Sequence, residues 1–409
     1  MVFWLRNREK VLAIIRISAI LVILHFLFLP AAQSRVHLQD TIPQPAAAEP
    51  AEYLPLLEGK RVGLVVNHTS LIGGCHLADS LLQLGVTISA IFSPEHGFRG
   101  TAPDGQLIAD QNDPFSGTPI ISLYGKKKKP SDKDLNGVDI LVFDIQDVGT
   151  RFYTYISTMH LVMEACAENG IPMIVLDRPN PNGHYIDGPV LDTAFSSFVG
   201  MHPIPAVHGL TVGELALMIN GEGWLDGGLQ CELTVIPCIG YTHSIRYDLD
   251  VNPSPNLPDM RAIYLYPTLC FFEGTTFSVG RGTDAPFQQL GHPALQNASH
   301  RFTPAPNAGS AYPKHEGVSC GGLDFRSITI DSLWQQGTID VELILSMYRS
   351  LPEGTQFFRS DGYFDLLAGT DSLRLLIESG ADATEIRESW GPALENYRRM
   401  RVHYLLYPD

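Results

Sequence analysis

A carboxyl group that follows an apolar segment is the feature of this sequence best suited to acid–base chemistry. Glu95 comes directly after the apolar stretch 86–92, with Phe92 and Phe98 close to it in the chain. A glutamic acid partly buried among aromatic side chains keeps its proton near neutral pH, as a general acid requires. The alternative is a glutamate that only caps the loop that follows the strand.

Two further carboxyl groups follow another apolar stretch, 138–143. Asp144 and Asp147 bracket Gln146, and the next segment, 150–155, mixes Arg151 with three aromatic rings. Such a mixture suits an amphipathic ligand such as a sugar, whose ring faces stack and whose hydroxyls need hydrogen-bonding partners. One of the two acids can instead pair with Arg151 and fix the loop. Asp144 lies nearer the strand, so we assign it that structural role and keep Asp147 as the second catalytic candidate.

Histidines beside these acids allow a second chemistry. His68 and His96 could ligate a metal together with Asp147, which would make the protein a metal-dependent hydrolase. A single histidine in a polar loop is more often a hydrogen-bonding group, so we predict no metal. Chelator treatment separates the two hypotheses.

Later polar positions have both structural and functional interpretations. Thr211 and Glu214 form a TxxE capping box, which is sufficient reason for both residues at a helix start. Asn256 stands in the rigid Pro-Ser-Pro-Asn loop 253–256. Glu273 with Arg281 is either an ion pair between domains or a second face of an active site.

Several cofactor and nucleophile signatures are missing. The sequence has no GxxxxGK[ST], no strand-coupled GxGxxG, no GxSxG and no HExxH. None of its six cysteines forms a CxxC pair or has zinc-site spacing. We therefore predict no cofactor, and hydrolysis by carboxyl groups becomes the simplest chemistry.

The elements that must position these residues alternate between strands and helices. Unbroken apolar runs predict buried parallel strands, and the runs between them have helical spacing. The expected strands are 62–66, 86–92, 119–123, 138–143 and 171–176, and the expected helices are 76–84 and 156–169. This pattern predicts a doubly wound α/β sheet, mostly parallel and Rossmann-like. Polar motifs follow the carboxyl ends of four strands, where open α/β sheets bind ligands.

Composition and charge set the organisation of the chain and limit its partners. The patterns along the 409 residues predict four parts: a signal peptide at 1–34, a linker at 35–54, a Rossmann-like domain at 55–262 and a smaller α+β domain at 263–409. A net charge of −16 repels phosphate backbones, which argues against nucleic acid as a partner. The one basic run, 126–129, is expected to be a solvated loop.

The first residues have the layout of a secretory signal. Four basic residues precede the apolar run 17–29, and small residues follow it. The run is short for a bilayer span, which needs about 20 apolar residues. We expect a protein that is exported to the periplasm or secreted, with no membrane span after cleavage. An uncleaved anchor starting near Val11 is the alternative.

Seven ordered motifs together resemble those of the NamZ-type exo-β-N-acetylmuramidases. They are Val66-Asn-His-Thr-Ser70, Phe92-Ser-Pro-Glu-His-Gly-Phe98, Phe143-Asp-Ile-Gln-Asp-Val-Gly-Thr-Arg-Phe-Tyr-Thr-Tyr155, Asp177-Arg-Pro-Asn-Pro-Asn182, His208-Gly-Leu-Thr-Val-Gly-Glu214, Pro253-Ser-Pro-Asn256 and Ser278-Val-Gly-Arg-Gly-Thr283. The resemblance runs from about residue 55 to the C-terminus. It implies a Rossmann-like domain and a smaller C-terminal domain with the active site between them.

The activity that the resemblance implies is hydrolysis of terminal β-1,4-linked N-acetylmuramic acid from peptidoglycan fragments, without a cofactor. Glu95 and Asp147 are then the catalytic candidates. The candidates for binding substrate are Asn67, His68, His96, Gln146, Arg151, Tyr153, Tyr155, His208, Asn256 and Arg281. N-acetylmuramic acid carries a lactyl carboxylate, so the site needs a cation. Its candidates are Arg151, Arg99, Arg178 and Arg281, and Arg151 is preferred. The alternative is a wall-binding protein that uses the same cleft without catalysis.

Overall fold

The computed structural model describes residues 42–95, 97–99 and 111–409. The expected signal segment 1–34, residues 35–41 of the expected linker, and His96 lie outside the described residues. Residues 43–409 form one compact unit. In the described part of the chain, no helix combines the length and the apolar character that a membrane span requires.

Residues 43–54 are packed, so the expectation that they belong to a linker is wrong. Gln44 forms a β-bridge with Ile239, and helix α2 (Pro50–Leu57) begins with a proline at its first turn. Ala47 and Tyr53 are fully buried, in the same apolar cluster as strand residues of the main sheet. The Tyr53 hydroxyl also donates a hydrogen bond to the Ala47 carbonyl at 3.0 Å. Small and aromatic side chains thus fix this segment against the sheet.

The main sheet has seven strands and is mostly parallel, as the apolar runs predict. Its spatial order is β11-β8-β7-β1-β4-β6-β5, and only the short β5 (Gln111–Asn112) is antiparallel to its neighbour. The parallel strands are β1 (Arg61–Val66), β4 (Thr87–Ser93), β6 (Pro119–Ser122), β7 (Ile140–Asp144), β8 (Met173–Leu176) and β11 (Leu233–Ile236). Counted along the chain, they follow the Rossmann order 3-2-1-4-5-6, which reverses direction between β1 and β7.

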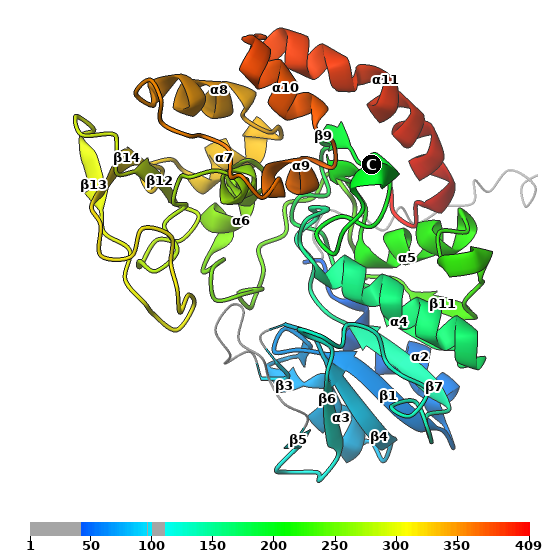
Figure 1. Cartoon of the computed structure of the whole chain (residues 1–409). Coiled ribbons are helices and arrows are strands. Elements are labelled where there is room, and N and C mark those ends of the chain that lie inside the picture. The colour runs from blue at the N-terminus through cyan, green and yellow to red at the C-terminus, as the bar shows by residue number, and fades with distance from the viewer. Residues whose placement is uncertain (1–41, 96, 100–110) are drawn as a thin grey trace, which may run out of the picture. The chain divides into compact units, whose positions relative to one another are not determined.

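Both faces of the sheet are covered, which explains the unbroken apolar runs. Along β1, Leu64 and Val66 belong to one core cluster and Val65 to the other, because successive strand side chains point to opposite faces. The first cluster takes in residues of α2 and of α3 (Leu77–Gln83). The second takes in residues of α4 (Tyr155–Asn169) and α5 (Val212–Gly221) (Figure 1). Helix α4 ends at Gly170, which adopts a left-handed conformation with φ 63°.

The C-terminal part carries a smaller antiparallel sheet and most of the later helices. Strands β12 (Gln289–His292), β14 (Cys320–Asp324) and β13 (His300–Phe302) pair in that order. The helices are α6 (Met260–Leu269), α7 (Ile330–Gln336), α8 (Val341–Ser350), α9 (Tyr363–Ala368), α10 (Ser372–Ser379) and α11 (Ala383–Arg401). The large apolar core runs from the main sheet into these helices.

Two short hairpins connect the larger elements. Strands β9 (Asp187–Val190) and β10 (Pro205–Val207) pair antiparallel, and α11 packs against β9 (Figure 1). Strands β2 (Leu71–Ile72) and β3 (Cys75–His76) form the other hairpin. Residues 191–204, which join β9 to β10, become important for the site described below.

A buried ion pair joins the ends of β7 and β8. Arg178 donates from Nε and Nη2 to the two carboxylate oxygens of Asp144, at 2.5 and 2.9 Å. Asp144 is fully buried and Arg178 is 5 % exposed. The structural role expected of Asp144 is confirmed, but its partner is Arg178 and not Arg151.

Arg178→Met should lower the free energy of unfolding by about 3–5 kcal/mol, because it leaves the Asp144 carboxylate buried and uncompensated. Urea denaturation of the purified protein measures this loss. The matched control is Arg326→Met, which breaks the half-exposed pair with Asp324 and should cost less than about 1 kcal/mol. Equal effects of the two substitutions would contradict a special role for the buried pair.

Candidate active site

Hydrogen bonds join the loops at the point where the strand order reverses. Ser70 Oγ, after β1, donates to the Asp144 carbonyl at the end of β7. Thr69 Oγ1 accepts from the Gln146 backbone N–H at 3.0 Å, and Asn67 Oδ1 accepts from the Thr69 N–H at 2.9 Å. The Gln146 amide donates to two further loop carbonyls. Asn67 and Gln146 are buried and hold the loops together, and Asn67 Nδ2 has no hydrogen-bond partner in the described part of the chain.

Asp147 also faces the interior of its loop. Its Oδ2 accepts from the Gly149 N–H at 2.6 Å, and His208 Nε2 lies 3.7 Å from the same oxygen. His208 Nδ1 accepts from the Leu210 N–H, which leaves Nε2 as the protonated nitrogen in the neutral ring. Both side chains are buried. Neither lines the cavity described next, although Asp147 Oδ1 and His208 Nε2 have no hydrogen-bond partner in the described part of the chain.

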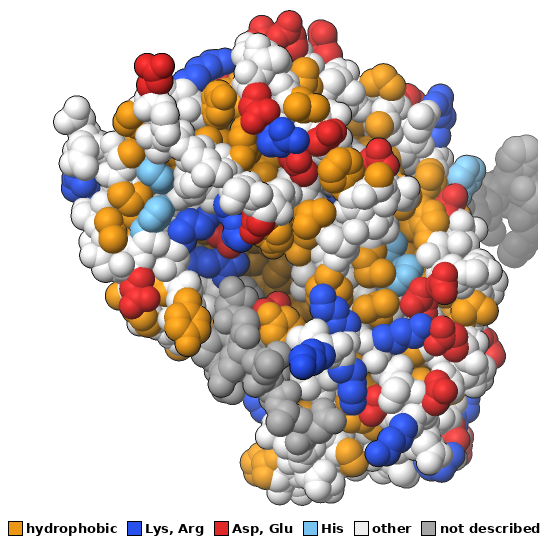
Figure 2. Space-filling view, in the orientation of Figure 1, with side chains coloured by type: hydrophobic (Ala, Val, Ile, Leu, Met, Phe, Trp, Pro, Cys, Tyr) orange, Lys and Arg blue, Asp and Glu red, His pale blue; other side chains and the backbone are white. Residues whose placement is uncertain are grey.

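A cavity of about 440 Å³ is lined in part by residues that follow β4, β6 and β7. Glu95 lines it, with residues from both halves of the chain. Figure 2 shows the hollow, with an apolar floor and basic side chains at its edge. Its charged lining residues are Glu95, Lys128, Glu273 and Arg281, and its aromatic ones are Tyr124, Phe152, Tyr153, Tyr155, Phe198, Tyr266, Phe287 and Tyr363. Five residues that the sequence predicts for the site line this cavity together: Glu95, Tyr153, Tyr155, Asn256 and Arg281.

The rings beside Glu95 differ from those expected. Phe92 is fully buried in the sheet core, and Phe98 packs edge-on against His76 with ring centroids 4.6 Å apart. Neither lines the cavity. Tyr153 and Tyr155 do, as a T-shaped pair at 4.9 Å, and the Tyr153 hydroxyl donates to the Pro253 carbonyl at 2.8 Å. Burial raises the pKa of Tyr153 well above its usual value, so its phenol stays neutral.

Glu273 and Arg281 form the opposite side of the cavity. Arg281 Nε donates to Glu273 Oε2 at 3.1 Å, and the guanidinium carbon lies 5.0 Å from the centre of the Phe287 ring. The pair is partly exposed, with 22 % of the Arg281 side chain and 23 % of the Glu273 side chain accessible. Behind it, Lys314 donates to the carbonyls of Thr275 and Phe277 at 2.6 and 2.8 Å. Burial lowers the pKa of Lys314 to about 8. Of the two interpretations of the Glu273–Arg281 pair, the active-site face fits this placement.

Arg151 does not point into the cavity, because its guanidinium is fully buried. Nη1 donates to the carbonyls of Pro189 and Ile204 at 2.8 and 2.7 Å, and Nη2 donates to those of Leu367 and Ala368 at 2.9 and 2.7 Å. Burial lowers its pKa to about 9, so it remains charged at neutral pH. The expected contact with a lactyl carboxylate is therefore wrong. Arg151 instead joins the base of the β9–β10 connection to helix α9.

The histidines proposed as metal ligands have no shared site among the described residues. His68 Nε2 is hydrogen-bonded to the Asn252 carbonyl at 2.8 Å, and burial lowers the pKa of His68. Within residues 42–95, 97–99 and 111–409, no three histidine, cysteine or carboxylate side chains gather as metal ligands would. His96 lies outside that part. His68 thus fixes the loop at 252 and does not line the cavity.

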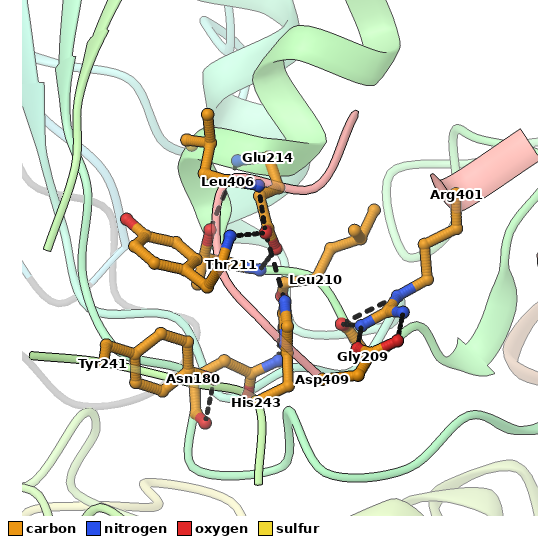
Figure 3. Close-up of polar contacts among 12 residues, drawn as sticks. Asn180, Gly209, Leu210, Thr211, Glu214, Tyr241, His243, Arg401, Leu406 and Asp409 are labelled. Atoms are coloured by element: carbon orange, nitrogen blue, oxygen red, sulfur yellow. Dashed lines mark hydrogen bonds and ion pairs between the residues drawn. The ribbon is translucent and has the colours of Figure 1, made fainter. Parts of the chain in front are cut away.

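Glu214 has the capping role that its spacing predicts. Its carboxylate accepts from the Thr211 N–H at 2.9 Å, and the Thr211 hydroxyl accepts from the Glu214 N–H, which completes the capping box. Figure 3 shows His243 and the Leu406 N–H bound to the same carboxylate, at 3.1 and 2.8 Å. These contacts fasten the C-terminal segment to the start of α5. Glu214 is fully buried and takes no part in the cavity.

Several residues that line the cavity have no signal in the sequence that would predict a site. Phe198, Tyr266 and Tyr363 come from segments without a recognisable chemical motif, and Lys128 was assigned to a solvated loop. Tyr266 lies on the helical face of α6, where the periodicity indicates core packing. Only the fold reveals that these segments meet.

Comparisons with known proteins identify the family to which the chain belongs. The pattern described as "Exo-beta-N-acetylmuramidase NamZ, N-terminal" matches residues 62–261, and its C-terminal counterpart matches residues 264–407. The chain belongs to this family. A curated relative is "Peptidoglycan beta-N-acetylmuramidase NamZ" of Bacillus subtilis, which is 39 % identical over 380 residues and aligns with 87 % of this chain and 89 % of its own.

Solved structures of NamZ-family relatives share the fold. A DUF1343 family protein from Bacteroides fragilis superposes with a TM-score of 0.83 at 46 % identity, covering 90 % of this chain and 100 % of its own. A second DUF1343 protein from the same organism gives 0.72 at 29 % identity, covering 89 % and 99 %. The Rossmann-like sheet with a smaller antiparallel C-terminal part is therefore the architecture of these relatives.

Arg151→Met should destabilise the protein by about 3 kcal/mol or more, because four buried carbonyls lose their donors. It should also lower kcat/KM on acidic and neutral glycosides alike, since the cavity walls that Arg151 joins would loosen. Urea denaturation and steady-state kinetics measure the two effects.

The control for this substitution is Arg61→Met, which removes an exposed ion pair with Asp139 and should change neither quantity. A loss confined to substrates with a carboxylate, at unchanged stability, would restore Arg151 as a substrate ligand.

Proposed function

We propose that this protein is an exo-acting glycoside hydrolase that releases terminal β-1,4-linked N-acetylmuramic acid from peptidoglycan fragments. The observation that carries the proposal is a cavity of about 440 Å³ that holds Glu95 between aromatic walls. Its size lies in the lower part of the range for small-molecule sites, which suits a terminal sugar better than a long glycan strand. The name of the Bacillus subtilis relative supports the same substrate.

Glu95 is the proton donor in this proposal. Glycosidases need an acid that protonates the leaving oxygen and a second group on the other side of the scissile bond. Of the carboxyl groups considered, Glu95 and Glu273 line the cavity, whereas Asp147 and Glu214 are buried away from it. We therefore assign the second catalytic group to Glu273 and no longer to Asp147. Arg281 holds the Glu273 carboxylate in an ion pair.

The second group has three possible functions: activating water, attacking the sugar directly, or orienting the acetamido group of the substrate. Inversion requires carboxyl groups about 6.5–9.5 Å apart, and direct attack requires roughly 5 Å. Proton NMR of the first-formed anomer distinguishes inversion from retention. Retention would then require a test with a substrate that lacks the acetamido carbonyl.

Export to the cell wall is part of the proposal. Its support is the sequence of residues 1–34, in which basic residues precede a short apolar run and small residues follow. We expect the exported protein to begin near Arg35 and to be found in the periplasm or medium. N-terminal sequencing of the exported protein measures this, and an intact Met1–Ser34 segment would show an uncleaved anchor.

Glu95→Gln should lower kcat by roughly 10²–10⁴-fold on a natural muramic acid disaccharide, because the amide keeps the shape but delivers no proton. A nitrophenyl glycoside should lose less wherever bond cleavage limits the rate, since nitrophenolate leaves without full protonation. Product release measured by chromatography gives the rates. Urea denaturation shows whether folding is intact.

Glu58→Gln, at an exposed position of the same chain, is the matched control and should leave kcat unchanged. Near-normal turnover of Glu95→Gln would transfer the acid role to Glu273. Binding of muramic acid glycosides without any release by the wild-type protein would identify a wall-binding protein instead. Chelator treatment should leave the rate unchanged, and an activity that a chelator abolishes would favour the metal-dependent hydrolase.

A further inference from the structure

One lysine of the basic run 126–129 differs from its neighbours in what it contacts. Lys127 pairs with Asp134 at 3.2 Å, and Lys129 pairs with Glu164 and Glu168 at 3.2 and 2.8 Å. Lys126 is exposed. Lys128 has no acidic partner in the described part of the chain, and it is the member of the run that lines the cavity.

The Lys128 ammonium sits on an aromatic ring. Its Nζ lies 3.9 Å from the centre of the Phe198 ring, which also lines the cavity. The face of the ring attracts the cation, but a phenylalanine ring offers no oxygen atom to accept a hydrogen bond from the three N–H donors of the ammonium. Lys128 thus presents a positive charge that the protein orients without neutralising it.

Phe198 lies in a tight turn, residues 197–200, that is closed by two backbone hydrogen bonds. Ser197 and Gly200 exchange backbone hydrogen bonds at 2.9 and 3.0 Å around Phe198 and Val199. A Cβ on Gly200 would lie 2.7 Å from a Leu191 methyl and 3.4 Å from Arg151 Nε. The turn therefore lies directly against Arg151. Phe198, in the same turn as Gly200, carries the ring on which the Lys128 ammonium lies.

The charges of the cavity show which cation is available to an anionic ligand. Arg281 is matched by Glu273 at 3.1 Å. The other arginines considered for an acidic substrate are engaged elsewhere: Arg178 with Asp144, and Arg99 with Asp79 and Asp113. In a protein of net charge −16, a cation that lines a cavity without an acidic partner calls for a ligand of opposite charge.

We propose that Lys128 binds the lactyl carboxylate of the muramic acid residue and thereby selects it over N-acetylglucosamine, which lacks this group. The inference rests on the proposed function, because it concerns the substrate of the same cavity. The flexible lysine side chain carries its charge at one end, so it can reach a carboxylate whose lactyl ether rotates. The Phe198 ring limits the positions of the ammonium group before substrate binds. Lys128 is then a specificity residue and transfers no proton.

The test compares Lys128→Met with Lys128→Arg on two nitrophenyl glycosides, the β-N-acetylmuramide and its uncharged lactyl amide. Lys128→Met should lower kcat/KM for the acid about 10- to 100-fold, the effect of losing one charge-assisted hydrogen bond. Turnover of the lactyl amide should change by less than about 2-fold on the same reasoning. Lys128→Arg should restore most of the preference for the acid. Lys126→Met, in the same run, is the matched control and should match the wild type on both substrates.

Two kinetic outcomes would overturn the inference. Equal losses on the acid and the amide would mean that Lys128 only supports the Phe198 turn. No loss on either would assign the carboxylate to another group, with Arg281 as the next candidate.

A binding measurement separates this inference from the proposed function. Titration calorimetry of wild type and Lys128→Met with free N-acetylmuramic acid and with N-acetylglucosamine needs no turnover. Preference for the acid in the wild type, lost in Lys128→Met, supports the inference even if no glycoside is hydrolysed, in which case only the proposed hydrolase activity fails. Absence of such a preference in the wild type overturns the inference, whatever the activity.

Discussion

The cavity depends on one buried guanidinium. Arg151 follows β7 in the chain, yet its side chain bonds carbonyls of Pro189 and Ile204 on one side and of Leu367 and Ala368 on the other. The first pair lies at the base of the connection that carries Phe198, and the second lies on α9, which contributes Tyr363 to the cavity wall. Guanidinium suits this position because its planar fork offers several donors in fixed directions. Its four bonds add to a backbone hydrogen bond from the Asp192 N–H to the Gly369 carbonyl, which also joins the β9–β10 connection to the end of α9.

The polar side chains after β1 distinguish this sheet from those of dinucleotide-binding proteins. In dinucleotide-binding proteins a glycine-rich turn after the first strand leaves backbone N–H groups free for phosphate. In this chain Asn67, Thr69 and Ser70 follow β1, and their side chains bond to each other and to the loop after β7. These bonds join the loops after β1 and β7 to each other. The cavity is lined by residues that follow β4, β6 and β7 and by residues from the C-terminal part.

Patterned segments could be predicted from the sequence, and loop orientations could not. The strands, α4 with its Gly170 cap and the Thr211–Glu214 capping box depend on spacing within a few residues, so local periodicity reveals them. Glu95 was found because a strand end is a defined place in an α/β fold. The directions of Asp147 and Arg151 depend on partners elsewhere in the chain. For Arg151 one acceptor lies 217 positions away. No pattern within the loop itself carries that information.

Arg151 and Lys128 show why a cation in a motif is not by itself a ligand for an anion. A buried charge must be compensated where it lies, and four carbonyl dipoles do this for Arg151. A charge that serves a ligand must stay uncompensated until the ligand arrives, and therefore it needs contact with solvent. Lys128 meets that condition, since it is only partly buried and rests on a ring and not on a carboxylate. The arginine inside the motif gives the site its shape, and the lysine in the run assigned to solvent gives the cavity an uncompensated charge.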